Sequence, residues 1–164
     1  MDNQSLRTTD SVDEIIKNYS SMVFRIAYSR TKNKYDADDV MQNVFMRYIR
    51  KERHFESEEH RKAWFIRTTI NCSNSFFTTS WFKNTTSFSD AAGSQIAPSD
   101  DNSSVVSAVS ELPKNMRSMI YLFYYEEYSV KKIAEILGKS ESAVKTQLFR
   151  ARGLLKKKFE EEDL

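Results

Sequence analysis

The sequence predicts an all-α protein, with two small helical domains joined by a flexible linker. Glycine and proline number only 3 and 2 in 164 residues, whereas an all-β chain needs these residues for its many tight turns. Apolar residues recur at helical spacing in both halves of the chain. Residues 83–107 show no such spacing and are rich in Ser, Thr, Asn and Asp, which is typical of a linker. We therefore expect one domain at 1–82 and the other at 108–164.

Composition excludes several classes of protein and of site. The longest apolar run, residues 119–125, is far shorter than the about 20 residues of a membrane span. The N-terminus lacks the apolar core of a secretory signal, so we expect a cytoplasmic protein. Cys72 is the single cysteine, which excludes an internal disulfide and a thiolate zinc site. The scarcity of glycine excludes a glycine-rich phosphate loop, and we expect neither a cofactor nor a metal.

Three amphipathic helices are predicted in the first half of the chain. The apolar face of the first consists of Val12, Ile15, Ile16, Tyr19, Val23, Ile26 and Ala27. That of the second consists of Val40, Met41, Val44, Phe45, Tyr48 and Ile49. Asp36 is the expected N-cap of this second helix, with Asp38 and Asp39 in its first turn, where the helix dipole favours negative charge. The third helix covers roughly 59–77, but Thr, Ser and Asn in its second half leave its end undefined.

The last third of the chain is predicted to be helical again. Pro113 stands near a helix start, and residues 119–125 are interpreted as helix because a lone strand here would have no partner. Ser129 is expected to cap the next helix, Gly138 to end it in the left-handed conformation, and Ser140 to cap the last. The apolar side of that last helix consists of Val144, Leu148, Ala151, Leu155 and Phe159.

The run SVKKIAEILGKSESAVKTQLFRAR predicts a helix-turn-helix motif. Ala134 is small where the two helices would cross closely, and Val144 and Leu148 would anchor the second helix to the first. The opposite face would offer to the major groove Ser142, Lys145, Thr146, Phe149 and Arg150. Residues 128–159 hold nine basic and two acidic side chains, 9 − 2 = +7, which suits a polyanion-binding surface. An ordinary helical hairpin with a solvated basic face is the alternative.

The two halves together resemble the extracytoplasmic-function (group IV) sigma factors of the sigma-70 family. The resemblance is carried by ADDVMQNVF (37–45), AWFIRTTIN (63–71) and ELPKNMRSMIYLFYYEEYSVKKIAEILGKSESAVKTQLFRARGLLK (111–156). It implies a non-enzymatic subunit of bacterial RNA polymerase that contains the second and fourth sigma regions. Such a subunit directs promoter-specific transcription initiation by reading the −10 and −35 DNA elements.

The resemblance also implies three sets of site residues. The residues implied to dock on the clamp of the core polymerase are Asp39, Gln42, Asn43 and Arg47. Those implied to recognise and open the −10 element are Arg61, Lys62, Trp64, Arg67 and Asn71. Those implied to read the −35 element are Ser140, Ser142, Ala143, Lys145, Thr146, Phe149 and Arg150. Residues 54–62 resemble the loop that pockets a flipped-out base, which fits the stacking and polar edge contacts that hold single-stranded bases. Judged by residue type alone, Trp64 fits a core aromatic better than a base contact.

Two departures from the family pattern concern DNA contacts and a local ion pair. Family members carry several arginines just after the Asn71 position, whereas the first basic residue here is Lys83. Fewer phosphate contacts weaken the grip on duplex DNA near −10. Base stacking, core packing and an inhibitor interface are all open to the aromatic residues Phe76, Phe77, Trp81 and Phe82. Lys132 stands where the family often has Glu, which puts one local salt bridge in doubt.

The partners implied by the resemblance are core polymerase, promoter DNA and an anti-sigma factor. If that anti-sigma factor is membrane-bound, it would hold this chain at the membrane.

A metalloenzyme would need three or more converging ligands. The candidate ligands are Asp36, Asp38, Asp39, His54 and His60. The carboxylates at the helix start have a simpler capping role. A dimeric helix-turn-helix repressor would have no use for the helix at 37–45, and an adaptor that binds only proteins would not depend on Arg150.

Overall fold

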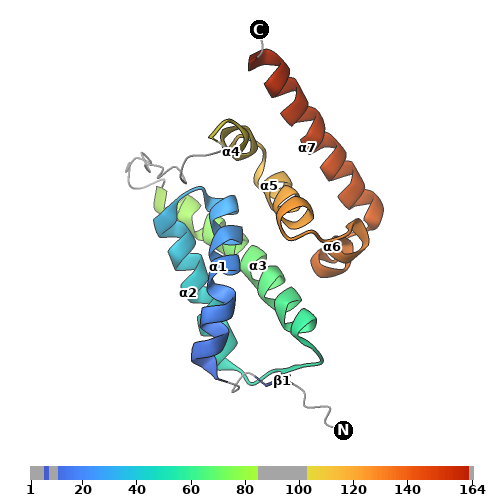
Figure 1. Cartoon of the computed structure of the whole chain (residues 1–164). Helices are drawn as coiled ribbons and strands as arrows, with labels where there is room; N and C mark the ends of the chain where they lie inside the picture. Colours follow the sequence, from blue (N-terminus) through green and yellow to red (C-terminus); the bar gives the residue numbers. More distant parts are fainter. Residues whose placement is uncertain (1–5, 8–10, 85–102, 163–164) are drawn as a thin grey trace. The chain divides into compact units, whose positions relative to one another are not determined.

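The computed structural model describes residues 6–7, 11–84 and 103–162 (Figure 1). The chain divides into two compact units, 1–95 and 96–164, and each is described by itself. Both are helical, which confirms the predicted fold class; the exception is one antiparallel pair of two-residue strands, β1 (Leu6–Arg7) and β2 (His54–Phe55). Residues 85–102 of the predicted linker lie outside the described residues.

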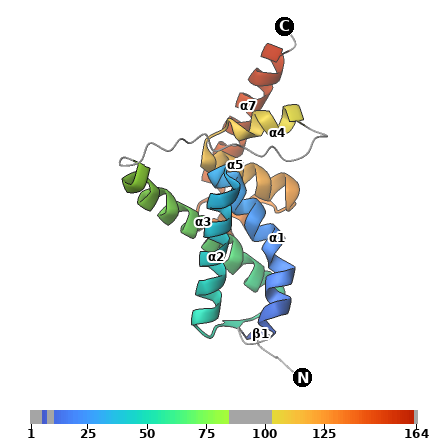
Figure 2. The same ribbon diagram turned by 90° about the vertical axis from the view of Figure 1, so that its left-hand side faces the viewer.

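The first unit is built from α1 (Val12–Thr31), α2 (Lys34–Arg50) and α3 (Glu58–Asn84). Each of these helices contacts the other two. The side chains that are completely inaccessible to solvent are Val23, Ala27, Ala37, Val40, Val44, Tyr48, Phe65, Ile66, Thr69 and Ser73. Figures 1 and 2 show the strand pair at the end of this unit where α1 begins.

The prediction that Asp36 caps α2 is wrong. The helix begins earlier, because the side-chain oxygen of Asn33 accepts hydrogen bonds from the backbone N–H groups of Tyr35 (2.9 Å) and Asp36 (3.1 Å). Asp36 therefore lies inside the first turn, where the helix dipole still favours its negative charge. The prediction that Asp38 and Asp39 lie in the first turn is also wrong, because the helix begins at Lys34 and they fall in its second turn.

Buried polar side chains explain why the end of α3 was undefined in the sequence. Arg30, only 2% exposed, donates from Nε to Ser73 Oγ and from Nη2 to Asn74 Oδ1, both at 2.6 Å. The hydroxyl of Thr69 donates to the Phe65 carbonyl at 2.6 Å. Arg30, Thr69 and Ser73 are therefore buried with hydrogen-bond partners, and the helix continues past them to Asn84.

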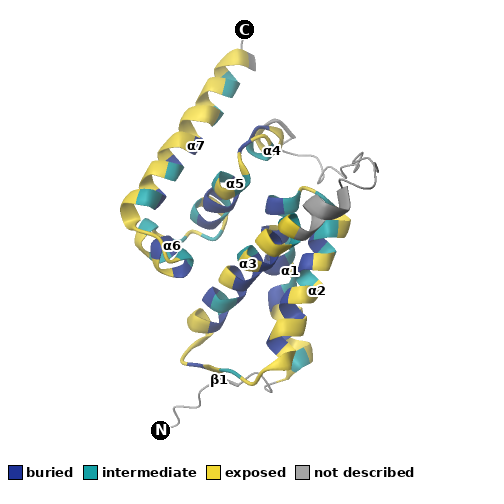
Figure 3. Ribbon diagram, turned by 180° about the vertical axis from the view of Figure 1, so that it is seen from behind, coloured by how far each residue is buried: buried dark blue, intermediate teal, exposed yellow. Residues whose placement is uncertain are grey.

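The second unit contains α4 (Ser103–Ser110), α5 (Lys114–Ile120), a π-helical segment η1 (Tyr121–Tyr125), α6 (Val130–Leu137) and α7 (Glu141–Glu162). Its buried core consists of Ala108, Leu112, Met119, Ile120, Leu122, Ile133, Ala134, Ile136, Val144, Leu148 and Ala151. Figure 3 shows α7 with one buried edge and long exposed stretches. No helix in the described ranges is both long and apolar enough to cross a membrane.

The three predicted caps of the second unit are confirmed. Ser129 Oγ accepts from the Lys132 N–H at 3.1 Å, and Ser140 Oγ accepts from the Ala143 N–H at 3.0 Å. Gly138 ends α6 with φ of 65°, a left-handed conformation that glycine adopts without a steric penalty.

Two elements differ in detail from the sequence prediction. The run 119–125 is helical as predicted, but from Tyr121 onward it widens into a π-helix, with the Glu126 N–H donating to the Tyr121 carbonyl at 3.1 Å. The helix α4 begins inside the predicted linker, so residues 103–107 belong to the second unit and not to the linker. It forms because Ala108 is buried and α4 contacts α7, and Glu111 just after it pairs with Lys158 of α7.

We expect the same substitution to have opposite effects at two glycines of this unit. Gly138→Ala should lower the free energy of unfolding by about 1 kcal/mol, because an L side chain is strained at positive φ. Gly153→Ala, inside α7, should raise it by about 0.5–1 kcal/mol. An added Cβ meets no atom within 4 Å at either position, so backbone conformation alone sets the sign.

Urea denaturation followed by far-UV circular dichroism measures both variants. Tryptophan fluorescence separates the two units, because both tryptophans lie in the first unit. A stabilising Gly138→Ala would contradict the left-handed cap.

Candidate nucleic-acid interface

The helix-turn-helix is formed by α6, the turn at Gly138 and α7. Ala134, predicted at the crossing of the two helices, is 5% exposed. Val144 and Leu148, predicted as anchors, are 0% and 1% exposed. This burial fixes the rotation of α7 about its own axis and therefore decides which of its side chains face outward.

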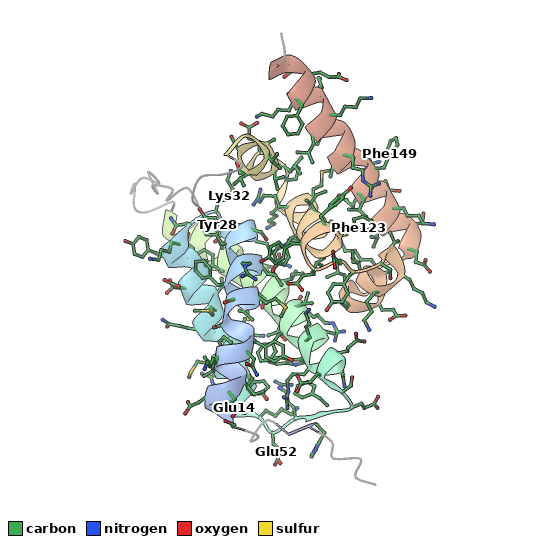
Figure 4. The ribbon with its side chains drawn as sticks, viewed as in Figure 1. Glu14, Tyr28, Lys32, Glu52, Phe123 and Phe149 are labelled. Atoms are coloured by element: carbon green, nitrogen blue, oxygen red, sulfur yellow. The ribbon has the colours of Figure 1, made fainter. Side chains whose placement is uncertain are left out.

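The outward face of α7 carries most of the residues predicted to read the −35 element. Ser142, Lys145, Thr146, Phe149 and Arg150 are all exposed. Phe149 is 77% exposed, and Figure 4 labels it on α7. Ala143 is half-buried, and Ser140 is exposed but uses its hydroxyl as the N-cap of the helix. We call the five exposed residues the α7 outer face.

The charge on the α7 outer face is available for binding. Across the described ranges, neither Lys145 nor Arg150 forms an ion pair. Lys132, which stands where the resemblance implied Glu, lies 3.9 Å from Glu135 in an ion pair within α6. This lysine therefore has an acidic partner in its own helix.

In the first unit, three residues predicted for the −10 element share a face of α3. Trp64 is half-buried, whereas Arg67 and Asn71 are exposed, and spacings of three and seven residues place them on one side of the helix. Arg53 lies 4.5 Å above the Trp64 ring, a geometry that favours cation–π attraction. Lys62 is half-buried. Trp64 thus contributes to the core with one side and borders the surface with the other.

Arg61 belongs to the interior, unlike the other −10 candidates. Its side chain is 2% exposed, donates to Glu58 Oε1 at 2.9 Å and lies 5.4 Å from the centre of the Phe55 ring. The Tyr19 hydroxyl donates to the same Glu58 carboxylate. Burial, and then the hydrogen bond and charge of Glu58, raise the pKa of Tyr19 well above its usual value. The cluster Tyr19, Phe55, Glu58 and Arg61 ties the start of α3 to α1.

The loop predicted at 54–62 is shorter than expected. His54 and Phe55 form β2, paired with β1, and α3 begins at Glu58. The helix begins there because Ser57 Oγ accepts from the His60 N–H at 3.1 Å. His60 Nδ1 in turn accepts from the backbone N–H of Glu56 at 3.1 Å. The sequence contains a signal for this start, because Ser57, a residue type that caps helices, is followed by two glutamates.

The predicted polymerase-docking residues lie on α2. All four of them are exposed: Asp39, Gln42, Asn43 and Arg47. Val40 and Phe45, expected in the core, are buried. Ile49, predicted on the apolar face, is 50% exposed, and sequence reasoning missed the exposed apolar residues Tyr35 (73%) and Met46 (50%) of the same helix. Met46 and Ile49 continue the spacing from Gln42 and enlarge this surface with apolar area.

The metalloenzyme alternative gains no support from the geometry. Asp36, Asp38 and Asp39 lie on α2, whereas His54 and His60 belong to β2 and α3. Across 6–7, 11–84 and 103–162, no three His, Cys, Asp or Glu side chains converge on a point that could hold a metal ion. Burial, and then the charge of Asp39, raise the pKa of the Asp36 carboxyl.

Comparison with known proteins identifies the family. The description "Sigma-70 region 2" matches residues 15–82, and "Sigma-70, region 4" matches residues 103–155. The ECF RNA polymerase sigma factor SigM of Bacillus subtilis (strain 168) is 32% identical over 156 residues, covering 89% of this chain and 93% of SigM. The chain belongs to the extracytoplasmic-function (ECF) group of the sigma-70 family. The family predicted from the sequence is thereby confirmed.

Further similarities agree with this assignment. The RNA polymerase sigma factor SigV of the same organism is 26% identical over 153 residues, 91% of each chain. Among solved structures, the sigma factor RpoE, in complex with the anti-sigma factor NepR from Bartonella quintana, has a TM-score of 0.68 at 18% identity, covering 88% of this chain and 94% of RpoE. CnrH, in complex with the cytosolic domain of CnrY, has a TM-score of 0.60 at 18% identity, covering 91% and 87%. These two structures show the same fold.

As a member of this family, the ECF sigma factor is a specificity subunit of transcription initiation that binds core RNA polymerase and promoter DNA. Members of the family have no catalytic role in that reaction. The three predicted sets of residues lie on α2, on α3, and on α7 with its N-cap.

We expect Arg61 and Arg67 of the sigma factor to differ sharply in their effect on stability. Arg61→Gln should lower the free energy of unfolding by about 2–3 kcal/mol, because Glu58 would lose a charged partner and the core a well-packed side chain. Arg67→Gln, at an exposed position, should change it by about 0.5 kcal/mol or less. Tryptophan fluorescence during urea denaturation measures both. Equal losses would mean that Arg61 has no special structural role.

Proposed function

We propose that this ECF sigma factor reads the −35 element with the α7 outer face, contacts the −10 element with Trp64, Arg67 and Asn71, and docks on the polymerase clamp through α2. The observation that carries the proposal is the orientation of α7. One side of the helix is buried by Val144 and Leu148, and the opposite side presents five polar, basic and aromatic residues.

The chemistry of the α7 outer face suits the major groove of duplex DNA. An exposed helix fits that groove, and Arg or Lys can pair with the O6 and N7 atoms of guanine. Arg150 and Lys145 supply those groups. The exposed Phe149 offers apolar contact of the kind that a thymine methyl group accepts. Ser142 and Thr146 can donate to bases or to phosphates.

The chemistry of the α3 face suits single-stranded DNA. Bases separated from a duplex are held by aromatic stacking together with positive charge that follows the backbone. Trp64 supplies an aromatic edge, Arg67 and Lys62 supply charge, and Asn71 supplies an amide for a base edge. Arg61 acts from the interior, as a residue that positions the start of α3 rather than as a DNA contact.

Because no arginines follow directly after Asn71, other side chains must contribute more to the opening of the −10 element. Phe76 and Phe77, whose ring centres are 6.0 Å apart, are half-buried at this end of α3. Aromatic rings at the surface can stack on unpaired bases. The side chains of Trp81 and Phe82 lie outside the described residues. The core polymerase would supply the remaining contacts.

We assign the two domains to separate promoter elements, with the segment between α3 and α4, inside the predicted linker 83–107, spanning the enzyme between them. The sigma factor itself performs no chemistry, and RNA synthesis belongs to the core polymerase. We further propose that an anti-sigma factor holds it inactive in the cytoplasm, or at the membrane if that partner is membrane-bound. The complexes of RpoE with NepR and of CnrH with CnrY support this regulation by analogy.

Transcription of genomic DNA by core polymerase, with and without the sigma factor, tests the proposed function. Mapping of RNA 5′ ends should show new start sites that share two upstream sequence elements at fixed spacing. Those elements then supply the promoter DNA for the experiments below. No new starts with core polymerase from the source organism would contradict the proposal.

The double variant Asp39→Lys and Gln42→Lys should weaken binding to core polymerase by about tenfold or more, because it reverses the charge of the docking surface and like charges facing each other in an interface are costly. The matched control is Asp13→Lys with Asn18→Lys, which makes the same charge change at exposed positions of α1. Fluorescence titration of core polymerase with labelled sigma factor measures both. Equal affinity of the two double variants would exclude α2 as the docking surface.

Arg150→Ala or Lys145→Ala should cost about 1–3 kcal/mol of binding free energy at the cognate promoter. The loss should shrink when the −35 element is scrambled, because a base contact is lost there in any case. Lys158→Ala serves as control, since Lys158 lies on the same helix but pairs with Glu111. Holoenzyme titrations on labelled promoter DNA measure the effect, and unchanged binding by both variants would refute the assignment of −35 reading to α7.

A further inference from the structure

An arginine beside the α7 outer face is held in place by aromatic residues of η1. Arg152 Nε donates to the hydroxyl of Tyr124 at 2.7 Å, across 28 residues of sequence. The guanidinium carbon lies 5.2 Å from the centre of the Phe123 ring and 5.7 Å from that of Tyr124. These rings are themselves in edge-to-face contact, 4.9 Å apart at 75°. Three contacts thus orient one exposed side chain.

The two terminal nitrogens of Arg152 are left for a ligand. Over the described part of the chain, no carboxylate pairs with this guanidinium, and its one hydrogen bond uses Nε. A guanidinium offers five N–H donors in a planar fork, so four remain on Nη1 and Nη2. Tyr124 is 54% exposed, so the cluster lies at the surface, where an anion can reach it.

Arg152 lies next to the α7 outer face. Arg152 follows Phe149 by three residues and Lys145 by seven, which places all three on adjoining strips of α7. Figure 4 labels Phe149 on α7 and Phe123 on the neighbouring segment. The arginine therefore borders the α7 outer face on the side of η1.

We propose that Arg152 binds a backbone phosphate of the −35 duplex and that Tyr124 is the residue that positions it. This inference rests on the proposed −35 reading by α7. A phosphate accepts the two parallel hydrogen bonds of a guanidinium fork, and a fork fixed in advance loses less side-chain entropy on binding. Because every nucleotide carries a phosphate, the contact adds affinity and register without adding sequence preference.

Arg152→Gln is the first test, made on the full chain assembled with core polymerase. Binding to cognate promoter DNA should fall about fivefold, with the same fold-change on DNA whose −35 element is scrambled. The slope of log affinity against log salt concentration should become shallower by about 1, because one phosphate contact is lost. Lys158→Gln, which removes the same charge from another side of α7, should leave the slope unchanged.

Tyr124→Phe tests the positioning role. It keeps the ring and removes the hydroxyl that accepts from Arg152, so affinity should fall about two- to threefold. The same change made in the Arg152→Gln protein should have no effect on affinity, because residues that act through one another are not additive. Thermal unfolding of each variant shows whether the second unit is still folded at the assay temperature.

Three outcomes would overturn the inference while leaving the proposed function intact. They are an unchanged salt slope for Arg152→Gln, a loss confined to the cognate −35 sequence, and full additivity of Tyr124→Phe with Arg152→Gln. A loss of core polymerase binding instead of DNA binding would assign the cluster to a protein carboxylate and would also overturn it. If the unmodified holoenzyme itself fails to select a promoter, the proposed function fails, a result distinct from all of these.

Discussion

The burial of one side of α7 is the constraint on which the DNA-facing geometry depends. Val144, Leu148 and Ala151 are at most 1% exposed, and their burial gives the helix a single rotation about its axis. Helical spacing then determines which residues of α7 face outward. Phe149, an apolar residue that would be buried in most contexts, is exposed because the positions that face the core are already occupied. The exposed ring is therefore a consequence of the packing beneath it.

Local signals in the sequence were sufficient to predict most of the fold. The caps at Ser129, Gly138 and Ser140 depend on side chains within three residues of the helix ends, so residue type reveals them. The cap of α2 was misassigned because Asn33 and Asp36 are both good N-caps and three residues apart. Only the observed hydrogen bonds distinguish them.

Features that depend on contacts between distant residues could not be predicted from the sequence. Ser73 and Asn74 in the polar second half of α3 have a hydrogen-bond partner in Arg30, which lies more than 40 residues earlier in the chain. The pairing of β1 with β2 and the bond between Arg152 and Tyr124 are likewise contacts across long stretches of chain. Periodicity reports the face of one helix and contains no information about the partner of a particular polar group.

The arginines show how far residue type alone can mislead about function. Arg30 and Arg61 are buried with polar partners and hold helices together, whereas Arg67 and Arg150 are exposed on faces that can meet DNA. A buried arginine is costly to strip of its partner, so it acts on the site through the position of the helix. An exposed arginine acts by direct contact with an anion. Arg152 combines the two cases, because a tyrosine fixes one nitrogen while the others stay open to solvent. Burial and partners, rather than charge, therefore decide which cations of this sigma factor are placed to contact a ligand and which hold its helices in position.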